Sequence, residues 1–285
     1  MFYSVTDRLV FYSILCVEAR KRNVKVLSLC LMLNHVHALV QTRDYASLRR
    51  FCTETEKQYT QAFNANSHLA GPLFQTTFGW APKRGEKKIR TCLAYIANNP
   101  VEKGLCARAE ENRWTFLRYG LKNNPFSDSF RLDYCSWRLR KAVTEVRSQR
   151  DRGKPLSYVL LSRIAFPLTT QEREQLTDRI ISLYSVIDYD ASKRYFKSFR
   201  AMLEAFTVNT GSEYDIREDY ECGAEKTYYA MNRRLYHAGF NMEEKSFFQL
   251  DEEELNKWIL DFRMNCGATP LQIRRFLHLK GGAEM

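Results

Sequence analysis

The chain has 285 residues, a formal net charge of +11 and a pI near 9.3, so it has room for two domains and favours a polyanionic partner. It contains no apolar run of about eighteen residues, and no two of its eight cysteines form a Cys-x-x-Cys pair, which argues against a membrane protein and a cysteine-rich zinc protein. Residues 1–120 carry about +9 of the charge. We expect a cytoplasmic protein, near the nucleoid if it is bacterial.

A helix and a pair of strands are the first predicted elements. Residues 7–22 place apolar side chains at helical spacing. Residues 24–40 form two apolar runs separated at Asn34, which predicts two strands joined by a tight connection. Because side chains of a strand alternate between its faces, His35 and His37 project from one face and can hold one divalent cation together.

Two more helices and a third strand follow. Residues 45–66 predict a helix, and after the Gly71-Pro72 break residues 73–80 predict a strand. Residues 87–99 predict a helix that ends at Pro100, since proline has no N–H to donate. One polar stripe of this helix contains Lys88, Thr91, Tyr95 and Asn99. A tyrosine followed one turn later by an amide can meet the histidine pair across a groove.

Basic residues gather at the start of this helix. A helix dipole is already positive there, so added cations suit the binding of an anion such as phosphate. The alternative is an ordinary solvated basic loop. The residues concerned are Lys83, Arg84, Lys87, Lys88 and Arg90.

These motifs carry a family resemblance over roughly residues 1–120. Met32-Leu33-Asn34-His35-Val36-His37, Phe74 with Ala81-Pro82-Lys83, and the run from Tyr95 to Leu105 resemble the single-tyrosine HUH transposases, and among them the REP-associated tyrosine transposases. The resemblance implies an α+β fold, with a ferredoxin-like antiparallel sheet that has helices on one face and the histidines on a central strand. Family members usually begin with a strand before the first helix, and we expect this chain to start too late to contain it, which leaves catalytic competence open.

The resemblance also implies a metal site and a nucleophile. His35, His37 and Asn99 would bind Mg²⁺ or Mn²⁺, and Tyr95 would attack the scissile phosphate of single-stranded DNA. The products would be a 5′-phosphotyrosine link and a free 3′-hydroxyl. Two histidines and an amide are an incomplete structural zinc site, so an ion that prefers oxygen ligands fits better.

Residues 121–285 predict a second, mainly α-helical domain that follows a linker near residues 123–125. Helices are expected over residues 169–184, over residues 251–265 and from Thr269-Pro270 through Leu279. The last two helices would form a helix-turn-helix near residues 251–280, with Gln272, Arg274 and Arg275 facing DNA. The alternative is an ordinary helical hairpin.

The sequence therefore predicts a metal-dependent single-stranded DNA endonuclease and strand transferase that cleaves hairpin or repeat DNA. Three rivals stay open: a catalytically impaired DNA-binding protein of the same fold, a domesticated nuclease acting on chromosomal repeats, and an RNA-binding module. We expect the chain to act as a monomer or homodimer and to have no membrane as a partner. Its 16 tyrosines and 18 phenylalanines include candidates for stacking on unpaired bases, which the sequence does not single out.

Overall fold

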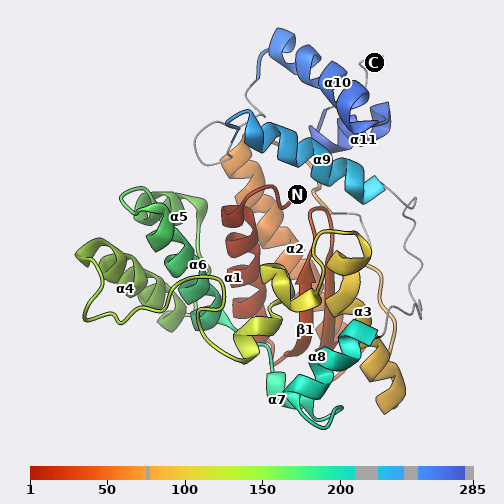
Figure 1. Ribbon diagram of the computed structural model, residues 1–285, viewed down its shortest axis with the longest axis vertical. Coiled ribbons are helices and arrows are strands. Elements are labelled where there is room, and N and C mark those ends of the chain that lie inside the picture. Colours follow the sequence, from red (N-terminus) through yellow and green to blue (C-terminus); the bar gives the residue numbers. More distant parts are fainter. Residues whose placement is uncertain (75–77, 209–223, 241–249, 280–285) are drawn as a thin grey trace.

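A two-stranded antiparallel sheet lies among helices in the computed structural model, which describes residues 1–74, 78–208, 224–240 and 250–279 (Figure 1). The strands are β1 (Lys25–Leu31) and β2 (Val36–Gln41), with Cys30 opposite His37. The Met32 N–H donates to the His35 carbonyl at 3.0 Å and closes the turn between them. The predicted tight connection is confirmed, although His35 lies in the turn and β2 begins one residue later.

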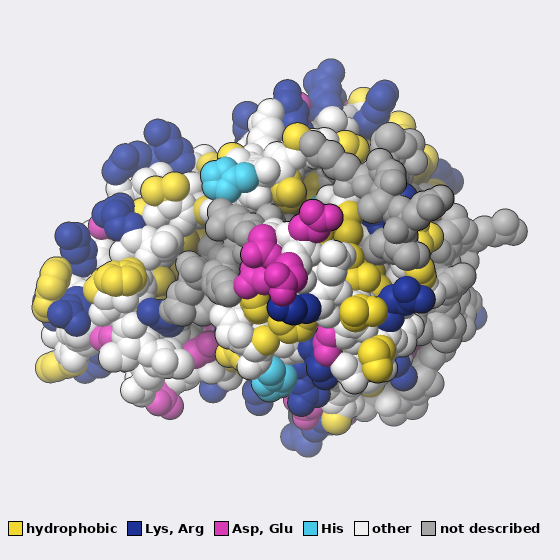
Figure 2. Space-filling view, turned by 90° about the horizontal axis from the view of Figure 1, so that it is seen from above, with side chains coloured by type: hydrophobic (Ala, Val, Ile, Leu, Met, Phe, Trp, Pro, Cys, Tyr) yellow, Lys and Arg dark blue, Asp and Glu magenta, His cyan; other side chains and the backbone are white. Residues whose placement is uncertain are grey.

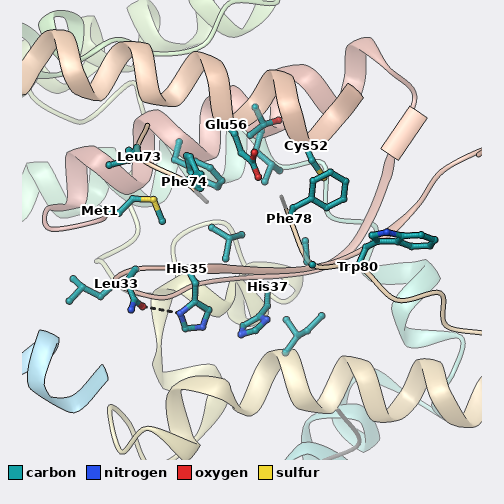
Figure 3. Close-up of a pocket in the computed structure, with 18 of the residues that line it drawn as sticks. Met1, Leu33, His35, His37, Cys52, Glu56, Leu73, Phe74, Phe78 and Trp80 are labelled. Carbon is teal, nitrogen blue, oxygen red and sulfur yellow. Dashed lines mark hydrogen bonds between the residues drawn. The ribbon is translucent and has the colours of Figure 1, made fainter. Parts of the chain in front are cut away.

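The first two helices start at side-chain caps that the sequence already displays. Helix α1 (Val5–Lys21) begins with a capping box between Ser4 and Asp7, and α2 (Tyr45–Ser67) begins at Asp44, whose carboxylate accepts the Ser47 N–H at 2.7 Å. Both helices lie on one face of the sheet, and α3 (Glu86–Glu102) lies on the opposite face (Figure 3). The α+β class is confirmed, but helices cover both faces of the sheet where one was expected.

Helix α3 does not end before Pro100. Pro100 lies in the last turn of this helix. Because proline has no N–H, the Ile96 carbonyl four residues earlier lacks its usual donor. The following bonds form normally, from Lys103 N to the Asn99 oxygen at 3.2 Å and from Leu105 N to the Pro100 oxygen at 2.9 Å. The helix therefore continues for three residues beyond its predicted end.

The predicted strand over residues 73–80 is wrong where the structure describes it. Residues 73–74 and 78–80 are irregular, and residues 75–77 lie outside the described part of the chain. Leu73 and Phe74 both pack against the hydrophobic core, although adjacent side chains of a strand point to opposite faces. In the described part of the chain the sheet consists of β1 and β2, and residues 73–74 and 78–80 pair with neither strand.

The rest of the described chain is helical. Three short 3₁₀ turns lie between Ala109 and Gly120. The helices expected over 169–184 and 251–265 are confirmed to within a residue, and the last helix ends three residues before Leu279. The remaining helices are α4 (Trp137–Asp151), α5 (Tyr158–Ala165), α6 (Thr170–Tyr184), α7 (Tyr189–Lys193), α8 (Phe199–Val208), α9 (Ala224–His237), α10 (Glu252–Cys266) and α11 (Pro270–Phe276).

The helical region packs directly on the sheet and on the N-terminal residues. The Asp188 N–H donates to the Val26 carbonyl at 2.8 Å, so the chain before α7 lies along β1. The Tyr3 hydroxyl donates to the Phe276 carbonyl of α11 at 2.9 Å. One cluster of buried apolar side chains runs through both regions. A domain boundary near residue 120 stays a prediction, while the packing across it is extensive.

Helices α4 to α6 form a lobe at one side of the molecule (Figure 1). Seen from above, this lobe carries Lys and Arg side chains together with exposed hydrophobic ones, while acidic side chains gather near the middle of the same view (Figure 2). Trp137 and Phe166 are among its exposed aromatic side chains. Among the described helices, none is both long and apolar enough to cross a membrane.

Candidate active site

His35 and His37 lie on the face of the sheet that α3 covers (Figure 3). Their ring centroids are 4.6 Å apart, with the ring planes at 81°. The Nδ1 atom of His35 lies 2.9 Å from the Asn34 Oδ1 atom, a contact that orients the His35 ring. The structure therefore brings the two imidazoles together as the alternation of side chains predicts.

Asn99 joins this pair from α3. Its amide nitrogen lies 3.0 Å from His37 Nε2, and the residue is only 1% exposed. The Asn99 Oδ1 atom is buried and has no hydrogen-bond partner within the described part of the chain. A buried carbonyl oxygen without a partner costs free energy unless a ligand supplies the missing interaction. This oxygen belongs to the same amide group whose nitrogen contacts His37, so a cation beside the imidazole could use it.

Tyr95 lies one helical turn before Asn99 and completes the cluster. Its ring centroid is 5.3 Å from that of His37, and the ring packs beside Cys30, Met32 and Ile96. All four candidate residues belong to the same chain. One copy of the protein thus places the proposed nucleophile against its own histidines.

Burial makes His37 a neutral imidazole. Desolvation, together with smaller charge repulsion from His35 and Lys103, lowers the pKa of His37 to about 3. The neutral ring is the form that binds a metal ion. Lys103 was not singled out from the sequence as a site residue. The signal that could have found it is its position one turn after Asn99 on α3.

Mg²⁺ or Mn²⁺ stays the ion expected from the sequence, and the geometry of the donor set allows it. Two adjacent ligands of an octahedral Mg²⁺ lie about 3 Å apart, because each is about 2.1 Å from the metal. The Asn99 amide and His37 Nε2 have this separation, and half a turn of the amide would place its oxygen there. No cluster of three His, Cys, Asp or Glu side chains occurs among residues 1–74, 78–208, 224–240 and 250–279. Substrate oxygens and water would have to complete the site.

A groove of about 1950 Å³ is lined by His35, His37 and Tyr95, whereas Asn99 lies outside its lining. Its size exceeds the roughly 300–1000 Å³ of small-molecule pockets and suits a polymer. The lining comes from β2, α2, residues 78–84, α3 and α11. Five of the seven predicted DNA-binding side chains line the groove, and among the described residues Glu56 is its single carboxylate. The five are Lys83, Arg84, Lys88, Arg274 and Arg275.

Lys87 and Arg90 are not part of this lining. Both lie on α3, where Lys87 is exposed and Arg90 pairs with Glu86 at 3.4 Å. The structure thus divides the basic residues at the start of α3 into two groups. Their role in DNA binding stays a prediction for both groups.

Comparison with protein families gives a match over residues 3–99 to the family described as "Transposase IS200 like". Residues 3–99, about a third of the chain, are therefore similar to the IS200-like transposase family. The matched segment contains His35, His37, Tyr95 and Asn99. The family indicates a DNA endonuclease activity of the transposase type, with DNA as the partner. The comparisons found no matching curated protein and no matching solved structure.

Outside the matched segment, α10 and α11 form two helices joined by a short turn. Gly267 ends α10 with a φ of +60°, and Thr269 caps α11. The Gln272 side-chain oxygen accepts the Thr269 N–H at 2.8 Å. This side chain, which was expected to face DNA, is therefore hydrogen-bonded within the helix cap. Arg274 and Arg275 are exposed. The helix-turn-helix interpretation stays a prediction, but both arginines share a groove with the histidines.

Proposed function

We propose that this chain is a metal-dependent single-stranded DNA endonuclease and strand transferase that acts on hairpin or repeat DNA. The observation that carries the proposal is the buried Asn99 amide at 3.0 Å from the neutral His37, with His35 and Tyr95 packed against the same imidazole. His35, His37 and Tyr95 line a groove with five basic side chains, and with Asn99 they lie within the segment that matches the transposase family.

Tyr95 is the nucleophile in this proposal. Its hydroxyl oxygen attacks the scissile phosphorus, the bond from phosphorus to the 3′-oxygen breaks, and the tyrosine proton ends on that oxygen. A 5′-phosphotyrosine and a free 3′-hydroxyl result. In strand transfer, the 3′-hydroxyl of another end attacks the same phosphorus, and Tyr95 regains a proton as it leaves.

His35, His37 and Asn99 would hold Mg²⁺ or Mn²⁺, which supplies a Lewis acid for the non-bridging phosphate oxygens. The chain itself fixes the geometry: Asn34 orients the His35 ring, and burial keeps His37 neutral. Helix α3 places Tyr95 and Asn99 one turn apart on its face toward β2. Such positioning of nucleophile and phosphate contributes much of the rate in phosphoryl transfer.

The basic side chains of the groove would contact the DNA phosphates. Lys83, Arg84 and Lys88 come from the segment before α3 and its first turn, and Arg274 and Arg275 come from α11. Phosphate contacts of this kind position the strand and make its affinity dependent on salt. Lys87 and Arg90, which lie outside the lining, would contribute less to binding.

Covalent capture tests the proposal. Hairpin oligonucleotides drawn from the DNA flanking the gene are incubated with the full chain in Mg²⁺, Mn²⁺ or chelator and run on a denaturing gel. The expected result is a metal-dependent adduct that the Tyr95→Phe variant does not form and that the Tyr134→Phe variant still forms, since Tyr134 is exposed and lies outside the groove. Hairpins that bind without forming any adduct would instead favour the DNA-binding protein without cleavage activity.

A further inference from the structure

Two large aromatic side chains remain half exposed at the groove. Tyr45 is the first residue of α2, and Trp80 lies in the irregular segment that leads to α3; each is 48% exposed. Their ring centroids are 4.6 Å apart and their planes differ by 34°. Residues of this size usually bury most of their surface, so an exposed pair of touching rings suggests a binding surface.

The pair lies in the groove that holds the histidine cluster. Tyr45 and Trp80 both line it, as do His35 and His37. Trp80 lies beyond His37 along the length of the strands, near the end of β2 (Figure 3). Lys83 and Arg84 follow Trp80 by only three and four residues and line the same groove. Aromatic faces and cations for phosphate thus come from one short segment.

The aromatic pair is held in place before any ligand binds. Asp44 caps α2 through the Ser47 N–H at 2.7 Å, and the Arg43 side chain donates to its other oxygen at 3.0 Å. This cap fixes the backbone that carries Tyr45, and Trp80 packs on the Tyr45 ring. A preformed surface binds a ligand with a smaller entropy cost than one that must first be ordered.

We propose that Tyr45 and Trp80 form a platform on which an unpaired nucleobase of the bound DNA strand stacks, while Lys83 and Arg84 contact the neighbouring phosphates. Every base has an apolar face, so such a platform tolerates many sequences and selects single-stranded over paired DNA. The proposal rests on the proposed DNA-binding function, but it needs neither cleavage nor a metal ion.

The test measures binding without chemistry. The full chain carrying Tyr95→Phe is titrated in chelator with two single-stranded oligonucleotides of equal length, one of thymidines and one of abasic sites. Adding Trp80→Ala or Tyr45→Ala should weaken binding to the thymidine strand by about five- to a hundredfold, the usual range for the loss of one stacked base. These variants should bind the abasic strand as the parent does.

Two controls separate stacking from loss of structure. Trp137→Ala removes an equally large side chain that is 66% exposed on α4 and lies outside the groove, and it should leave both affinities unchanged. Trp80→Phe keeps an aromatic ring, so it should still prefer thymidine to abasic DNA. It should also lose the part of the fluorescence quenching on DNA binding that comes from Trp80.

The outcomes are distinct. If Trp80→Ala distinguishes thymidine from abasic DNA as well as the parent does, the platform is overturned while the proposed endonuclease function stands. If the parent binds no single-stranded DNA, both the platform and the proposed function are overturned. If Trp80→Ala and Tyr45→Ala prefer thymidine to abasic DNA as strongly as the parent does, and the covalent capture gives an adduct, then bases stack elsewhere in the groove.

Discussion

The Asn99 amide meets His37 Nε2 at 3.0 Å, across the interface between α3 and β2. The Asn99 oxygen beside it is buried without a hydrogen-bond partner in the described part of the chain. If Asn99 binds a metal ion, its substitution should lower the affinity for that ion. If Asn99 only joins α3 to β2, its substitution should leave the metal affinity unchanged. Asn99 is therefore the sharpest probe of the proposed metal site.

Asn99→Ala should lower the apparent affinity for Mn²⁺ by at least about ten- to a hundredfold, the cost that follows from disturbing even the outer ligands of a metal site. Asn99→Asp keeps an oxygen ligand and should retain most of the affinity. The measurement is cleavage of a hairpin oligonucleotide as a function of Mn²⁺ concentration. An unchanged half-saturation point in Asn99→Ala would remove this residue from the metal site.

The packing of Tyr95 on His37 within one chain predicts that the active site works in cis. The rings are 5.3 Å apart between centroids, so no second copy is needed to bring them together. A mixture of the His37→Ala and Tyr95→Phe variants should form no covalent adduct beyond what each forms alone. Each variant mixed with wild type is the control. Recovery of the adduct in the mixture would show that the tyrosine of one copy serves the histidines of another.

Lys88 and Lys87 form a matched pair for the electrostatics of the groove. They are adjacent and both exposed, but only Lys88 lines the groove. Lys88→Ala should weaken single-strand binding and reduce the slope of log affinity against log salt by about 0.7, the value for one contact to a single strand. Lys87→Ala should leave the slope nearly unchanged. Equal slopes for the two variants would make Lys88 an ordinary surface cation.

His278 links acid stability to the docking of α11. Its Nε2 lies 3.0 Å from the Tyr3 hydroxyl oxygen, and burial, with a smaller effect of the N-terminal amino group, lowers the pKa of His278 to about 4. In the unfolded chain a histidine titrates near 6.5, so between pH 6.5 and 4 only the unfolded state gains this proton. The free energy of unfolding should therefore fall by up to about 1.4 kcal/mol per pH unit as the pH decreases.

Urea unfolding at several pH values between 7 and 4.5 measures this effect. His278→Asn should show a shallower loss of stability on acidification, because one source of proton uptake is gone. His237→Asn, a change at an exposed histidine, is the control and should behave as the wild type does. Parallel curves for wild type and His278→Asn would show that the docking of α11 does not depend on this ring.

The helices with local signals were predictable. The capping boxes at Thr169 and Thr269 lie within four residues of chain, and the predicted starts of α6 and α11 agree with them, whereas α1 begins two residues before its predicted start at residue 7. The end of α3 was not predictable in this way. There, packing in the last turn outweighs the missing N–H of Pro100.

The candidate site likewise contains features that the sequence predicts and features that it does not predict. The proximity of His35 to His37 follows from strand alternation, and the place of Tyr95 and Asn99 beside them was implied by the family resemblance. The groove was not predictable, because it brings Arg274 together with Lys88 across 186 residues of chain. The Tyr45–Trp80 contact likewise depends on how α2 and the segment before α3 meet. Composition shows that aromatic residues are available and does not show which ones pair.

Leu33 is hydrogen-bonded both to the N-terminal segment and to α9. Its carbonyl accepts the Phe2 N–H at 2.9 Å, and its N–H donates to the Tyr229 hydroxyl of α9 at 3.1 Å. Leu33 lies two residues before His35, in the turn that presents the histidines. Joining residues 1–120 to a different tail would separate Leu33 from Tyr229 and remove one of the hydrogen bonds that hold this turn. The position of the histidines is therefore coupled to the packing of α9.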